Sequence, residues 1–94
     1  MEYTMLSLDE VNKYIPEMER LNVSEIARGP EGVIAAYKKL RGKLPDEWKK
    51  KRRGFIQRTL PAYHRNPTYR RWLSLIAWFY KPPIKHEVEN ASLK

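Results

Sequence analysis

Cationic side chains dominate the second half of this chain. Residues 48–86 contain eleven Lys or Arg and no Asp or Glu, whereas residues 1–47 contain nine acids and seven bases. The chain has 94 residues and a formal net charge of +8, so its positive charge is concentrated rather than mixed. A surface tuned only for solubility usually intersperses both signs, because neighbouring like charges repel. A concentrated positive field attracts polyanions, chiefly nucleic acid, or the acidic surface of a protein.

The densest part of this segment, DEWKKKRRGFIQR (residues 46–58), has the period of an amphipathic helix. At 100° per residue Trp48 and Phe55 share one arc, and Arg52 falls inside it. We expect the Arg52 stem to lie along these rings while its guanidinium reaches solvent. We expect the other cations to bind phosphates. The predicted surface consists of Lys49, Lys50, Lys51, Arg53 and Arg58, extended by Arg70, Arg71 and Lys81.

Aromatic residues accompany these cations, since eight of the eleven lie in residues 48–86. Aromatic faces stack on unpaired bases, but a small domain also needs them for its core. In the apolar segment TYRRWLSLIAWFY, Trp72 falls on the apolar arc and Trp78 on the polar strip that contains Arg70, Arg71 and Ser74. We therefore predict that Trp72 belongs to the core and that Trp78 is a candidate contact for a partner.

The expected fold is all-α, a single domain of residues 1–83 with four or five short helices packed around the C-terminal apolar helix. Residues 84–94 lack apolar periodicity and are predicted to be a disordered tail. Capping residues, prolines and glycines set the expected bounds. These predict one kinked helix or two abutting helices over 8–21, a short turn over 24–28, and a helix from Pro30 to a stop at Gly42. They also predict a helix that starts at Leu44-Pro45-Asp46-Glu47, a turn bracketed by Pro61 and Pro67, and a last helix that Asn66 caps, Pro67 opens and Tyr80 ends.

A catalytic role has little support in the sequence, and we expect no enzyme activity, cofactor or metal. Residues 48–86 offer no carboxylate as base or ligand, and His64 has no sequence context for a triad. The chain contains no cysteine, which is typical of a reducing compartment such as cytoplasm. Its start, MEYTMLSLDE, has no secretory pattern, and its longest apolar run, residues 75–80, is too short to cross a bilayer.

Two resemblances bear on function. VSEIARGPEGVIAAYKKLRG, residues 23–42, resembles a helix-turn-helix motif, with VIAAYKK as the recognition helix. The motif has its turn glycine where this chain has Glu31, and Lys38 and Lys39 would lie late in a helix that reads bases mainly with its N-terminal residues. Two ordinary packed helices explain the same stretch. The chain as a whole also resembles small uncharacterised bacteriophage proteins, a likeness that implies no assigned activity.

Three functions fit these patterns. The leading hypothesis is non-enzymatic binding of nucleic acid, DNA or RNA, mainly through phosphates and with low sequence specificity. The alternative is a protein-interaction module, such as a phage-type inhibitor or adaptor, that docks its basic face and Trp78 on an acidic partner. Attachment to an anionic membrane surface ranks third, because Trp48 and Phe55 are needed for the core of so short a chain. The sequence does not constrain the oligomeric state.

Overall fold

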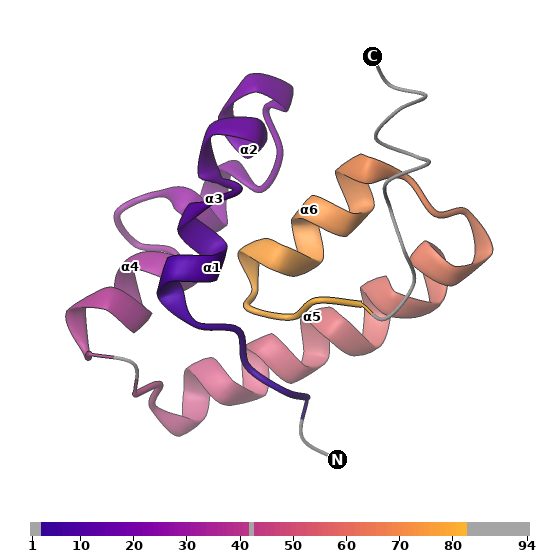
Figure 1. Ribbon diagram of the computed structural model, residues 1–94. Coiled ribbons are helices and arrows are strands. Elements are labelled where there is room, and N and C mark those ends of the chain that lie inside the picture. The colour runs from indigo at the N-terminus through magenta and orange to yellow at the C-terminus, as the bar shows by residue number, and fades with distance from the viewer. Residues whose placement is uncertain (1–2, 42, 83–94) are drawn as a thin grey trace.

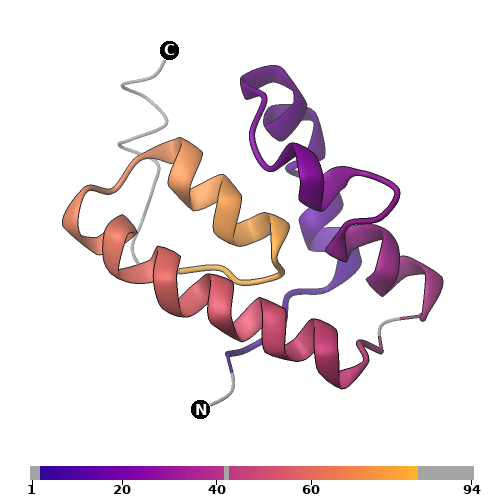
Figure 2. The same cartoon turned by 180° about the vertical axis from the view of Figure 1, so that it is seen from behind.

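The computed structural model describes residues 3–41 and 43–82, so the predicted tail and the predicted stop at Gly42 lie outside the described residues. The described residues contain no strand, and their helices are α1 (Leu8–Asn12), α2 (Ile15–Leu21), α3 (Glu25–Arg28), α4 (Val33–Lys39), α5 (Asp46–Arg65) and α6 (Tyr69–Ala77). The predicted all-α fold is confirmed. Figures 1 and 2 show α5 along one side of the molecule, α6 running antiparallel beside it, and α1–α4 grouped together, with α4 leading toward the start of α5 and α2 far from it.

The centre of the core is α6, as its apolar sequence predicted. It packs against α5 on one side and α2 on another. Trp72 is fully buried and meets the Tyr14 ring edge-on, with 4.9 Å between centroids and 82° between planes. The predicted cap at Asn66 and start at Pro67 are wrong, because the helix begins at Tyr69 after Thr68, whose hydroxyl accepts a hydrogen bond from the Arg71 N–H at 3.1 Å. Its buried residues are Tyr69, Trp72, Leu73, Leu75, Ile76 and Ala77.

The N-terminal segment forms two abutting helices. The Ser7 hydroxyl accepts a hydrogen bond from the Glu10 N–H at 3.2 Å, which is the predicted cap of α1. Pro16 lies in the first turn of α2, where its missing N–H costs no helical hydrogen bond. Val11 and Met18 keep one buried face across the junction.

The predicted start of a helix at Pro30 is wrong, because α4 begins at Val33 with Gly32 as its N-cap. Gly32 lies against the end of α3, where a Cβ would come within 2.2 Å of the Ile26 carbonyl oxygen and 2.4 Å of that of Ala27. The chain from Pro30 to Gly32 therefore folds back on α3 before α4 starts. The helix ends at Lys39 with Leu40 as its C-cap, and the next residue, Arg41, is left-handed with φ 56°.

The predicted turn between Pro61 and Pro67 is also wrong, because α5 continues through Pro61 to Arg65. A proline inside a helix removes one hydrogen bond and costs about 3 kcal/mol. Here the ring of Pro61 is exposed, so the lost bond faces solvent. Two residues later Tyr63 is fully buried, and its burial offsets much of that cost.

The last helix stops three residues before the predicted Tyr80. The N–H of Phe79 bonds the Ile76 carbonyl at 2.8 Å and that of Tyr80 bonds Leu75 at 3.0 Å, which is a Schellman ending. Phe79 holds the left-handed position, φ 63°, that glycine usually occupies. This conformation brings its fully buried ring to 4.2 Å from the ring of Tyr37, centroid to centroid. Packing of Phe79, rather than the prolines beyond it, sets the end of α6.

Candidate nucleic-acid interface

Five of the predicted site residues project from the solvent side of α5. Ile56 and Tyr63 anchor the opposite side of this helix in the core. Its period of 3.6 residues therefore turns the intervening cations outward. All five are exposed, and we call them the α5 basic face: Lys49, Lys50, Lys51, Arg53 and Arg58.

An aromatic cluster adjoins the α5 basic face. The ring of Trp78 stacks on Phe55, with 5.0 Å between centroids and 17° between planes. Trp48 lies 6.1 Å from Trp78 by the same measure. The Lys51 ammonium lies 4.8 Å from the centroid of Trp48, within the range of a cation–π interaction. All three rings are partly buried, so the cluster is both an edge of the core and a part of the surface.

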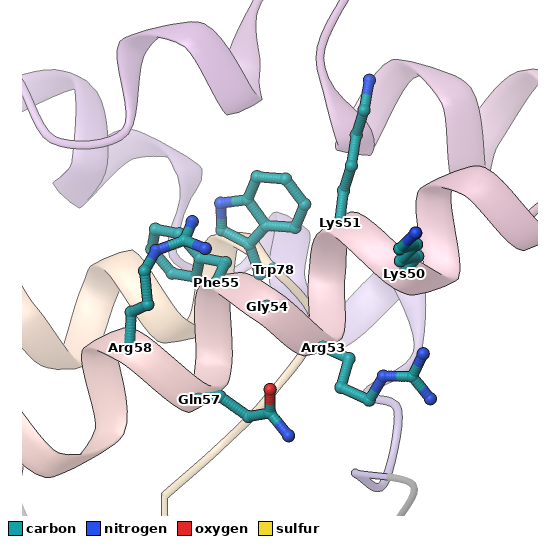
Figure 3. A pocket seen from close by; sticks show the side chains of 8 residues that line it. All are labelled: Lys50, Lys51, Arg53, Gly54, Phe55, Gln57, Arg58 and Trp78. Atoms are coloured by element: carbon teal, nitrogen blue, oxygen red, sulfur yellow. The ribbon is translucent and has the colours of Figure 1, made fainter.

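A surface depression of about 660 Å³ lies where the cluster meets the basic face. In Figure 3 Lys51 and Arg58 rise on opposite sides of the Trp78 indole, whereas Arg53 and Gln57 point toward the other side of α5. The depression therefore has aromatic and cationic walls. We call it the Trp78 depression, and its lining consists of Lys50, Lys51, Arg53, Gly54, Phe55, Gln57, Arg58 and Trp78.

Gly54 gives Arg58 its place in this depression. A Cβ on Gly54 would lie 3.2 Å from a terminal guanidinium nitrogen of Arg58, one helical turn further on. The Arg58 side chain therefore folds back over a bare stretch of helix backbone. Glycine within a helix lowers stability by about 1 kcal/mol relative to alanine. In this position it leaves room for the guanidinium beside the aromatic cluster.

Arg52 fixes the chain that carries Trp78. The prediction that its guanidinium reaches solvent is wrong, because only 4% of Arg52 is exposed. Its Nε donates to the Trp78 carbonyl at 2.7 Å. Its terminal nitrogens donate to the carbonyls of Phe79 at 2.9 Å, Tyr3 at 2.9 Å and Thr4 at 2.8 Å. We call these bonds the Arg52 network, and through it α5 holds both the N-terminal segment and the end of α6.

Two of the predicted site residues lie elsewhere, at the start of α6. Arg70 donates a hydrogen bond to the Leu21 carbonyl, and Arg71 donates to the Asn66 carbonyl at 3.0 Å. Both line a second depression, together with residues of the α2–α3 connection and Ser74, and α5 contributes nothing to that lining. The structure therefore does not bring Arg70 and Arg71 into the Trp78 depression.

Lys49 and Lys81 also lie outside the Trp78 depression. Lys49 is on the far flank of α5, where it borders a hollow with Met5, Lys43 and Leu44. Lys81 is exposed in the segment that follows α6 and is not part of any of these linings. Lys50, Lys51, Arg53, Arg58 and Trp78 are the predicted site residues that the fold gathers in one place.

The sequence pattern predicts Phe55 and Trp48 in the core and indicates no role for Gly54 or Gln57 at the site. The helical period does place Phe55 and Trp48 at the border of the basic face. What the period does not give is the position of Trp78, which lies after the end of α6 and meets α5 only through tertiary packing.

Acids stand in the first turn of α5, at Asp46 and Glu47, whereas two ion pairs of the described residues lie away from the α5 basic face. The ion pairs Glu10–Lys13, at 3.1 Å, and Glu17–Arg20, at 2.8 Å, lie in the first two helices. Over residues 3–41 and 43–82 there is no cluster of three or more His, Cys, Asp or Glu side chains that could hold a metal ion. In the same part of the chain no helix has the length and apolar character needed to span a membrane.

Comparisons with known proteins add no assignment. No protein-family model, no curated protein and no solved structure gives a significant match to this chain. The helix-turn-helix and bacteriophage resemblances therefore stay predictions.

Proposed function

We propose that this protein binds nucleic acid without catalysis, mainly through phosphates and with low sequence specificity. The observation that carries the proposal is the α5 basic face, whose five exposed cations belong to a segment that contains no Asp or Glu between residues 48 and 86. Lys and Arg that neutralise phosphates release counterions, and this release drives non-specific binding. Arg70, Arg71 and Lys81 contribute to the overall positive field rather than to the same contact surface.

The geometry favours α5 over α4 as the binding element. In a helix-turn-helix motif the first residues of the recognition helix contact the bases. Val33 and Ile34, at the start of α4, are buried in the core, with 0% and 9% of their surfaces exposed. A mode in which α4 enters a groove would therefore rely on Lys38 and Lys39 at its far end, whereas the α5 cations are already presented to solvent.

Two matched double variants test this proposal. Lys50→Gln with Arg53→Gln removes two exposed cations from α5, and Lys38→Gln with Lys39→Gln removes two from α4. Binding to random-sequence duplex and single-stranded DNA is measured by fluorescence anisotropy from low to high salt. The α5 variant should lower the magnitude of the slope of log K against log salt by about 1.8 on duplex, which is about 0.9 for each lost contact. The α4 variant should change the slope less, and both should keep the parent's thermal midpoint.

Two results would count against the proposal. A larger effect of the α4 variant would move the interface to the helix-turn-helix-like segment. Absence of salt-dependent binding in the parent would reject nucleic acid altogether. The alternative, a module that docks the α5 basic face and Trp78 on an acidic protein, would then take its place.

A further inference from the structure

The Trp78 depression has the features of a site for one flat aromatic ring. Phe55 stacks on the Trp78 indole and holds it in place. Trp78 is only partly buried, and it belongs to the lining of the depression. The Arg52 network holds the main chain at Trp78, because Nε of Arg52 binds the Trp78 carbonyl at 2.7 Å. An indole that is fixed from two sides and open to solvent is a ready stacking surface, since it loses little freedom when a ring is added.

The charges around this indole suit a strand that passes over it. Lys51 and Arg58 are seven residues apart on α5, which is about 10 Å along the helix axis. They rise on opposite sides of Trp78 in Figure 3. A base placed on Trp78 would therefore have one cation near the phosphate on its 5′ side and another near the phosphate on its 3′ side, whichever way the strand runs.

We propose that the Trp78 depression binds one unpaired base of single-stranded nucleic acid, stacked on Trp78, with its flanking phosphates bound by Lys51 and Arg58. This inference rests on the proposed function and adds a preference to it. In a duplex the faces of the bases are covered by their neighbours, so a duplex meets only the outer cations of α5. A single strand meets both the cations and the indole. The protein should therefore prefer single strands over duplex at equal salt.

An abasic oligonucleotide separates stacking from charge. Oligo(dT) and an abasic strand of the same length carry the same phosphates, but only the first has bases to stack. The parent should bind oligo(dT) about fivefold to a hundredfold more tightly than the abasic strand, the range that stacking of a base on an aromatic ring provides. Trp78→Leu should bind the two strands within about twofold of each other. Its affinity for duplex should stay near that of the parent.

Trp48→Leu is the matched control for the tryptophan variant. It removes an indole from the same cluster, yet Trp48 is not part of the lining of the Trp78 depression. This variant should keep most of the preference for oligo(dT) over the abasic strand. Thermal unfolding by circular dichroism checks that both variants are folded. If Trp78→Leu does not fold, the comparison of the two strands with the parent protein decides the question by itself.

The outcomes separate the two levels of the argument. If the parent binds oligo(dT) and the abasic strand equally, with normal salt dependence, the stacking inference is wrong and the proposed function stands. If Trp48→Leu removes the preference as completely as Trp78→Leu, the effect does not belong to this depression and the inference also fails. If the parent binds neither strand nor duplex at any salt concentration, the proposed function fails and this inference falls with it.

Discussion

Replacing Arg52 by methionine should lower the free energy of unfolding by about 3 to 6 kcal/mol. Methionine keeps much of the unbranched stem and removes the guanidinium, so the variant tests the Arg52 network rather than the packing of the side chain. The four acceptors of this network are the carbonyls of Tyr3, Thr4, Trp78 and Phe79.

The magnitude follows from what each carbonyl does after the guanidinium is removed. Thr4 is exposed, so water replaces its donor. The Phe79 carbonyl keeps a second donor, the Leu6 N–H at 2.8 Å. The carbonyls of Trp78 and Tyr3 then account for most of the loss. A hydrogen bond to a charged group contributes about 1.5 to 3 kcal/mol, and two such bonds give the expected range.

Urea unfolding followed by circular dichroism measures this effect, with Arg53→Met as the control. Arg53 is the next residue and is exposed, so its replacement should change stability by less than about 0.5 kcal/mol. For a domain of this size a loss of 3 kcal/mol corresponds to a fall of roughly 12 °C or more in Tm. If the free energies of unfolding of the two variants differ by less than about 1 kcal/mol, water replaces the hydrogen bonds of the Arg52 network at little cost and the reasoning is refuted.

Three further predictions rest on single residues. Gly32→Ala should destabilise the protein by at least about 3 kcal/mol in urea unfolding, because the added Cβ would come within 2.2 Å of the Ile26 carbonyl oxygen. Gly29→Ala is the control and should cost little, because its Cβ would come no nearer than 3.4 Å to that oxygen. Arg41→Gly should stabilise the protein by up to about 1 kcal/mol, because Arg41 is exposed with φ 56°, and Arg41→Ala should give no such gain. Burial, followed by the hydrogen bond with Glu17, raises the pKa of Tyr69 from 10.0 to about 12. Its neutral form is therefore favoured in the folded state, so stability that is fully present below pH 10 should decline between pH 10 and about 12. Tyr69→Phe should remove this part of the decline, and equal slopes for parent and variant in unfolding measured across that range would contradict the assignment.

Features that depend on near neighbours along the chain were predictable from the sequence. The cap at Ser7 and the solvent side of α5 both follow from spacing over one or two helical turns. The five cations assigned to α5 are exposed, as that spacing predicted. The apolar composition of α6 placed Trp72 in the core, where it is fully buried. The charged half of the candidate site was therefore visible in the sequence.

Features that depend on distant segments were not predictable in this way. Arg52 donates hydrogen bonds to carbonyls that lie between 26 and 49 positions away from it in the sequence. Nothing in the helical period shows that such distant acceptors will converge on Arg52. The position of Trp78 was not predictable for the same reason, because this residue lies beyond the last turn of α6 and stacks on Phe55 of another helix. Pro61 predicted a break that burial of Tyr63 overrides. The aromatic half of the site therefore required the fold.

Repulsion within the α5 basic face works against the favourable spacing of Asp46 to Lys50 and of Glu47 to Lys51 at the start of α5. Lys49 and Arg53 are four residues apart, and Lys50 and Arg53 three apart, so both pairs place like charges next to each other. Lys49 and Lys50 also stand in the first turns of α5, where the helix dipole disfavours cations. Each effect amounts to a few tenths of a kcal/mol, and an acid at any of these positions would reverse it. The helix forms in spite of them because Arg52, Ile56 and Tyr63 are buried on its other side. Like charges gathered on one face, beside a depression lined by a fixed indole, favour a role in binding a polyanion over a role in solubility.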